Sequence, residues 1–206
     1  MALVKHTNNS LSNITALPSA VPTGKMTLLS TATASSSASL SFNSTYINST
    51  YPIYKFEFID IHPATNSAYF QVNLSIDNGS NYNVTKTTTY FHAYNNEAGD
   101  ANALNYDPAR DLAQSTSYQD ISYQTGNDND QATSGNLFLF NPSSTTFVKH
   151  FITNINSYSD VSGTDYSIDT YVAGYGNTTS AVNAINFKFS SGNIDAGQIK
   201  LYGLGS

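Results

Sequence analysis

The stretch "FQVNLSI", residues 70–76, decides the fold class. Phe70, Val72, Leu74 and Ile76 alternate with polar Gln, Asn and Ser residues. Successive side chains of a β-strand point to opposite faces, so a two-residue period predicts a strand with one apolar and one polar face. We therefore expect the four apolar side chains to pack on a core and the polar ones to face water.

The same alternation recurs along the chain after Lys25. It predicts further strands at 40–42, 54–58, 136–140, 147–155, 185–189 and 199–201. Turn-forming residues separate them, as at 77–79 ("DNG") and 195–197 ("DAG"). Short strands at this spacing predict an all-β fold, an antiparallel β-sandwich of jelly-roll type that covers residues 25–206. One short helix is expected at 107–114, where Asp107 would cap it and Pro108 would take the first helical position.

The composition indicates a folded chain with a polar but weakly charged surface. Only 11% of the 206 residues are charged, whereas Ser, Thr and Asn are abundant. Low charge combined with low hydrophobicity can indicate disorder, but 15 Tyr and 11 Phe provide ample apolar area for a core. A chain of this length buries roughly 70% of its unfolded surface, which suffices for one domain.

Charge and cysteine content exclude several classes of function. The eight Lys and Arg residues form no cluster and the net charge is −6, so a nucleic-acid partner is not expected. The chain has no cysteine, which removes disulfides, thiolate nucleophiles and Cys zinc sites. No stretch approaches the ~20 apolar residues of a membrane span, and the N-terminus lacks a secretory apolar core. We expect neither a membrane span nor export by a signal peptide.

Residues 1–24 differ from the rest of the chain and are interpreted as an N-terminal extended assembly arm. Leu11, Ile14 and Leu17 have a helix-like spacing, and Pro18 and Pro22 follow closely. A segment this short is not stable by itself. We expect it to dock on its own domain or on a neighbouring subunit; a frayed terminus is the alternative.

No arrangement of residues points to catalysis. The chain has no G-x-S-x-G nucleophile elbow, and its four His residues are dispersed. Glycoside hydrolysis needs two opposed carboxylates, and the sequence singles out no such pair. Asp128 and Asp130 in "GNDNDQ" resemble the start of a calcium loop that is then not completed, so they are weak Ca²⁺ candidates and a solvated loop is the alternative. We expect no enzyme activity, no cofactor and no strong metal site.

Tyrosines outside the expected strands are candidates for surface contacts. Aromatic rings with a polar tip can stack on sugar rings or on another protein, although many tyrosines serve only as core or rim residues. The candidates are Tyr46, Tyr51, Tyr82, Tyr94, Tyr158 and Tyr175.

Four segments carry a resemblance to structural proteins of tailed-bacteriophage virions, especially those of aquatic phages. They are "LLSTATASSSASLSF" (28–42), "STYPIYKFEFIDIHPATNSAYFQVNLSIDNGSNY" (49–82), "LFNPSSTTFVKHFI" (139–152) and "NAINFKFSSGNIDAGQIKLYGL" (183–204). Their order, with the "GNDNDQ" loop between the second and third, makes the resemblance fairly specific, and it extends over roughly residues 11–206. Members of this family are described as tail-fibre or capsid-decoration proteins.

The resemblance implies a non-enzymatic virion component that is assembled in the host cytoplasm and displayed on the particle surface. It implies other capsid or tail subunits as partners and a homo-oligomer, with a trimer as one option. It brings no catalytic residues. The alternative is a receptor-recognition module of a tail fibre or spike that binds host-surface glycans through its tyrosines. A polysaccharide depolymerase is the third hypothesis.

Overall fold

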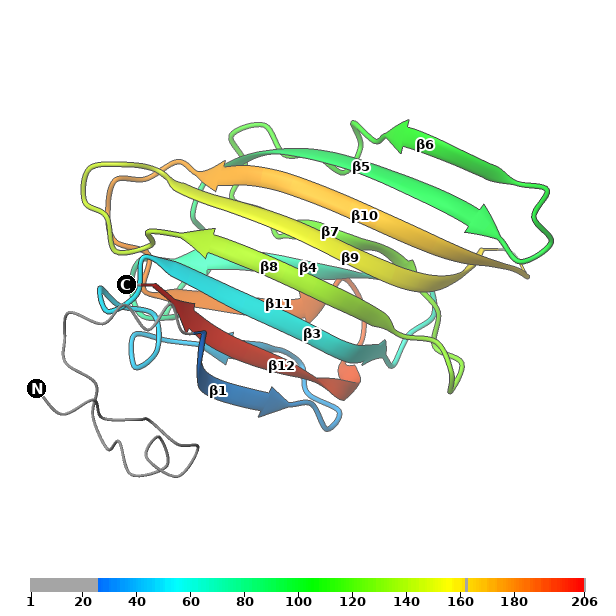
Figure 1. The fold of residues 1–206 in the computed structure, drawn as a ribbon, viewed down its shortest axis with the longest axis horizontal. Helices are drawn as coiled ribbons and strands as arrows, with labels where there is room; N and C mark the ends of the chain where they lie inside the picture. The colour runs from blue at the N-terminus through cyan, green and yellow to red at the C-terminus, as the bar shows by residue number, and fades with distance from the viewer. Residues whose placement is uncertain (1–25, 162, 206) are drawn as a thin grey trace, which may run out of the picture.

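The computed structural model describes residues 26–161 and 163–205, which form twelve β-strands in two sheets (Figure 1). Every pair of neighbouring strands in these sheets is antiparallel, and no helix occurs among the described residues. The strands are β1 (Thr27–Thr33), β2 (Leu40–Phe42), β3 (Ile53–Pro63), β4 (Ala68–Ser75), β5 (Lys86–Asn96), β6 (Asn102–Tyr106), β7 (Gln119–Thr125), β8 (Thr133–Phe140), β9 (Lys149–Val161), β10 (Thr164–Gly176), β11 (Ala184–Phe189) and β12 (Ile194–Leu204). The predicted all-β antiparallel sandwich is therefore confirmed.

The two sheets differ in width. The larger has eight strands in the order β1-β12-β3-β8-β9-β10-β5-β6, and the smaller has four in the order β2-β11-β4-β7. Figure 1 shows the larger sheet in front and the smaller sheet behind it. The hairpins β9–β10 and β5–β6 lie together at one end of the larger sheet, beyond β8. There β7 forms the edge of the smaller sheet and lies against β9 and β10.

The core between the sheets is built around Phe187 on β11. Its ring centroid lies 5.2–5.9 Å from those of Phe56, Phe58 and Phe70, and Phe42 packs on it edge-to-face. All five rings are at most 2% exposed. Tilted and edge-to-face packing of this kind is favourable for aromatic rings beyond the area that they bury.

The alternation in 70–76 is confirmed for the apolar face of β4 but wrong for its polar face and its end. Asn73 is fully buried because its amide donates to the carbonyl oxygens of Tyr82 (2.7 Å) and Thr116 (3.0 Å) in two crossing loops. The strand ends at Ser75, so Ile76 leaves the core and is 44% exposed. The predicted turn at 77–79 follows at once, with positive φ at Asn78 and Gly79.

The predicted helix at 107–114 is wrong. Only a turn forms there, in which the amides of Ala109 and Arg110 donate to Asp107. The segment pairs with β5 instead, since Thr88 donates to the Leu112 carbonyl and accepts from the Leu112 amide. The backbone carbonyl and amide of Leu112 are therefore not free for the hydrogen bonds of a helix.

The predicted turn at 195–197 is also wrong. These residues belong to β12, where the register with β3 shifts on either side of Ala196. Gly197 has φ +109°, and a Cβ there would lie 2.4 Å from the Asp60 carbonyl oxygen. The glycine is therefore required by a β-bulge, which brings two backbones close together.

Candidate functional site

A cleft of about 480 Å³ opens where the larger sheet extends past the smaller one. It is lined by His92 and Tyr94 of β5, Asn105 and Tyr106 of β6, Asp107, Tyr123 of β7, and Tyr166 and Ile168 of β10. Its volume lies within the range of about 300–1,000 Å³ that is usual for ligand sites. We call it the aromatic cleft.

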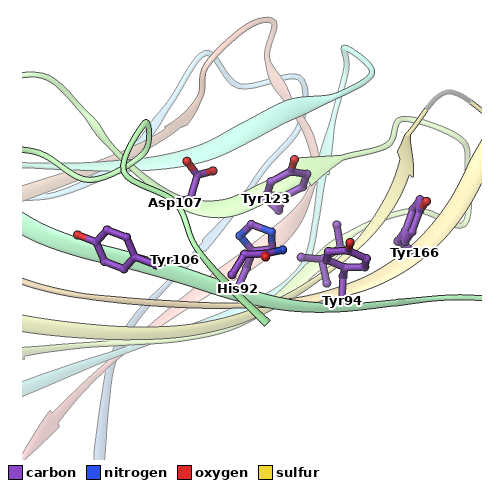
Figure 2. Close-up of a pocket in the computed structure, with 8 residues that line it drawn as sticks. His92, Tyr94, Tyr106, Asp107, Tyr123 and Tyr166 are labelled. Carbon is purple, nitrogen blue, oxygen red and sulfur yellow. The ribbon is translucent and has the colours of Figure 1, made fainter. Parts of the chain in front are cut away.

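The alternation of β5 aims His92 and Tyr94 to the same face of the sheet, with Tyr166 of β10 beside them. Figure 2 shows His92 beside Tyr123 and Tyr94, with Tyr166 farther along. The His92 ring centroid lies 4.8 Å from that of Tyr123 and 6.1 Å from that of Tyr94, and Tyr94 meets Tyr166 edge-to-face at 5.6 Å. The four rings form one continuous aromatic wall.

Asp107 supplies the carboxylate of the cleft, and residues outside the cleft hold it in position. The amide of Asp107 donates to the Tyr90 carbonyl (3.0 Å), and its carboxylate lies 3.9 Å from Arg110 Nε. Arg110 in turn binds the Asp120 carboxylate at 3.1 Å, and its guanidinium lies 3.9 Å from the centre of the Tyr69 ring. This neighbouring cluster fixes the position of Asp107 and keeps Arg110 outside the cleft lining.

His92 is uncharged in the folded protein near neutral pH. Burial lowers the pKa of its imidazole, and the nearby Asp107 carboxylate opposes this effect only in part. No Lys or Arg among residues 26–161 and 163–205 lines the cleft. The cleft therefore offers aromatic faces, hydroxyls, an amide and one carboxylate, but no positive charge.

One polar atom of the cleft lining, His92 Nδ1, has no hydrogen-bond partner among the described residues. By contrast, buried Gln119 nearby uses its amide nitrogen and oxygen fully, toward Arg110, Asp120 and Thr88. Most buried polar side chains in proteins are paired, so unpaired ones need an explanation.

A second hollow of about 390 Å³ shares Tyr166 with the aromatic cleft. Its wall includes Asn95, Glu97, Asn156 and Tyr158. This wall also has no Lys or Arg and is richer in amides than the first.

The outer face of the larger sheet carries an uncovered apolar band at the same end of the molecule. Five residues from five adjacent strands form this outer band: Leu104, Phe91, Tyr171, Ile152 and Phe138. The Phe91 and Tyr171 rings stack at 5.2 Å with an interplanar angle of 7°. Leu104 is 71% exposed and Ile152 is 49% exposed.

The six tyrosines predicted as surface contacts do not come together. Tyr46 and Tyr51 pack on the hydrophobic core, and Tyr82 is half-buried beside Gly79. The expectation that all six lie outside strands is wrong for three of them, which belong to β5, β9 and β10: Tyr94, Tyr158 and Tyr175. Only Tyr94 lines the aromatic cleft, and Tyr158 lines the second hollow.

The sequence analysis singled out only Tyr94 as a contact residue and missed the other seven that line the cleft: His92, Asn105, Tyr106, Asp107, Tyr123, Tyr166 and Ile168. The alternation of large rings in "TYFHAY" (89–94) carries a usable signal, because it places Tyr90, His92 and Tyr94 on one face. Nothing in the sequence indicates that Tyr123 and Tyr166 meet them.

The two weak calcium candidates, Asp128 and Asp130, lie in the loop between β7 and β8. Asp130 lines a separate hollow with Asp60, His62 and Asp195, and the Asp128 carbonyl lies 3.1 Å from His62 Nε2. Within residues 26–161 and 163–205, no group of three or more His, Asp or Glu side chains is arranged to hold a metal ion. The arm residues Leu11, Ile14 and Leu17 lie outside the described part of the chain.

No helix in the described part of the chain is long and apolar enough to cross a membrane. No protein-family model, no curated protein and no solved structure matches the chain.

Proposed function

We propose that this chain is a non-enzymatic structural protein of a tailed-bacteriophage particle, displayed on its outside as a capsid-decoration or tail/fibre component. Its arm and its outer band would bury themselves against neighbouring subunits, and many repeated copies would add weak contacts into a stable attachment. The resemblance of the four quoted segments to virion proteins supports the particle as its location.

The observation that carries the proposal is the uncovered outer band. Exposed apolar patches rimmed by polar residues are typical of protein–protein interfaces. The charges beside the band are already paired: Asp169 accepts a hydrogen bond from the Asn154 amide at 2.9 Å. Lys55, whose amine lies over the Phe138 ring, is paired with Glu57 at 2.7 Å. A charged partner would therefore find few unpaired charges beside the outer band.

A second copy of this chain is the partner that suits such a face. The chain carries a net charge of −6, so two copies repel each other except through an uncharged surface. In a symmetric pair the same patch meets itself, which places apolar side chains opposite apolar side chains. We therefore propose a homo-oligomer built on the outer band.

The order of the strands supports the jelly-roll part of the prediction. Without the two hairpins at the end of the larger sheet, the sheets have the orders β1-β12-β3-β8 and β2-β11-β4-β7. The chain then changes sheet at every step except from β4 to β7, which pair within the smaller sheet, and its first strand pairs with its last. This is the order expected of two nested Greek keys, and jelly rolls are common in viral capsid and lectin domains. The link from this fold to a virion is an analogy only.

Particle incorporation tests the proposal. Antibody labelling of intact particles should mark their outside, and a chain lacking residues 1–24 should stay folded but be absent from the particle. Folding is expected to survive because the hydrophobic core begins at Ala34, with Leu29 and Ala32 packed against it. Unlabelled particles would contradict the virion role, whereas normal incorporation of the truncated chain would contradict only the role of the arm.

A second candidate function, a receptor-recognition module for host glycans, is favoured by one observation. This is the aromatic cleft, whose four rings and polar groups form a concave site.

A further inference from the structure

We propose that the aromatic cleft binds uncharged saccharides, with sugar rings stacked on its tyrosines and sugar hydroxyls bound by its polar rim. This inference deepens the second candidate function by naming the ligand class. It does not depend on the chain being a virion component, nor on the outer band.

The rings provide the stacking surface. The face of an aromatic ring is electron-rich, so it attracts the weakly positive C–H groups on the face of a sugar ring. Tyr94 and Tyr166 are half-buried and set nearly perpendicular, at 85°. They offer a ring face and a ring edge to the same ligand.

The rim provides hydrogen bonds of both kinds. Asp107 only accepts, the Asn105 amide both donates and accepts, and each tyrosine hydroxyl does either. A sugar hydroxyl also donates and accepts, which matches this mixture better than an apolar ligand does. The unpaired nitrogen of His92, which is 7% exposed, adds one more polar group at the floor of the cleft.

Electrostatics restricts the ligand class to uncharged sugars. Phosphate, sulfate and carboxylate groups are normally bound by Arg or Lys. The cleft has neither, and Arg110 is occupied by Asp120 and Tyr69 outside it. Asp107 in the cleft would repel sialylated or sulfated glycans.

The test is calorimetric titration of the full chain with neutral gluco-, galacto- and manno-trisaccharides, and with sialyllactose and a sulfated disaccharide as charged probes. We expect at least one neutral trisaccharide to bind and the charged probes to bind at least tenfold more weakly. Failure of all neutral probes, at concentrations up to the millimolar range and on a wider array of neutral glycans, would overturn the proposal. Tighter binding of the charged probes would do so as well.

Variants locate the site. Tyr94→Ala and Tyr166→Ala should each weaken binding at least tenfold, and Asp107→Asn should weaken it by a smaller factor. Tyr175→Ala is the matched control, because Tyr175 lies on the same strand as Tyr166 but outside both hollows. Thermal unfolding checks that each variant is folded, and Tyr94→Leu, which fills the space without an aromatic ring, replaces Tyr94→Ala if the latter is not. Unchanged binding by both folded tyrosine variants would overturn the assignment of the site.

Discussion

Lys86 and Lys149 are both fully buried, and both lie in register with Gly176 on the strand between them. Neither amine is paired with a carboxylate in the described part of the chain. Lys86 Nζ donates to Asn73 Oδ1 (2.5 Å) and the Val84 carbonyl (2.8 Å), whereas Lys149 Nζ donates to the carbonyls of Phe147 and Thr178. Burial lowers the pKa of both amines, that of Lys86 from 10.5 to about 8.

The first prediction is that Lys86 makes stability rise with pH. Since the folded pKa is about 8 and the unfolded value 10.5, the unfolded chain binds more protons between these pH values. The contribution of Lys86 to the free energy of unfolding therefore increases across that window and is least favourable below pH 8. Relative to Lys86→Met, the wild type should gain on the order of 2–3 kcal/mol between pH 7 and pH 10.

Urea unfolding of both proteins at a series of pH values measures this difference. The comparison cancels the titration of the tyrosines, which both proteins share. Lys200→Met, at a half-buried position on β12, is the control for the loss of any lysine. Parallel curves for the wild type and Lys86→Met would contradict the prediction.

The second prediction concerns the centre of the core. Phe187→Ala removes the ring that contacts four other phenylalanines, and it should destabilise the protein by about 3–5 kcal/mol. Phe147→Ala is the control, because Phe147 is 69% exposed and should lose less than about 0.5 kcal/mol. Chemical denaturation of the two variants makes the comparison. Equal losses would mean that the core is centred elsewhere.

Local alternation was sufficient to predict the sandwich because strands such as β3 bury one face and leave the other more exposed. Tyr54, Phe56 and Phe58 share one buried face of β3, as the two-residue period requires. The burial of Asn73 was not predictable, since it depends on carbonyl oxygens 9 and 43 residues away along the chain. A local pattern carries no information about which loops cross a strand.

The aromatic cleft was unpredictable for a related reason. His92, Tyr123 and Tyr166 come from three strands. Of these, β5 and β10 belong to the larger sheet and β7 belongs to the smaller one. Their meeting depends on the larger sheet extending past the smaller one, which follows from the placement of two hairpins. Tyr94 alone was singled out in advance, as one of six candidates of the same residue type.

The third prediction concerns the ion pair between Arg110 and Asp120. Arg110→Met removes the cation beside Asp120, a carboxylate that burial already pushes toward a raised pKa. The loss leaves a buried charge with the Gln71 amide as its remaining side-chain partner, so we expect a destabilisation of about 2–4 kcal/mol at pH 7. The loss should shrink as the pH falls and Asp120 becomes protonated.

Denaturation of the wild type and Arg110→Met at pH 7 and pH 4 gives the required comparison. The double change of Arg110→Met with Asp120→Asn should recover part of the stability, because no charge then remains buried. If the double variant is less stable than Arg110→Met, the unpaired buried charge of Asp120 is not the cause of the lost stability.

The fourth prediction tests the outer band as a contact between copies. Ile152→Asp places a charge at the middle of the band, between Phe138 on β8 and Ala173 on β10, where a second copy would desolvate it. We expect the wild type to self-associate and this variant to do so at least about tenfold more weakly, a change that corresponds to about 1.4 kcal/mol. Leu28→Asp is the matched control, since Leu28 is 52% exposed on β1 at the opposite end of the same sheet. Sedimentation equilibrium over a range of concentrations measures all three proteins. A wild type that stays monomeric at every concentration, or an equal effect of the two substitutions, would exclude the outer band as the interface, because only a contact centred on Ile152 separates them.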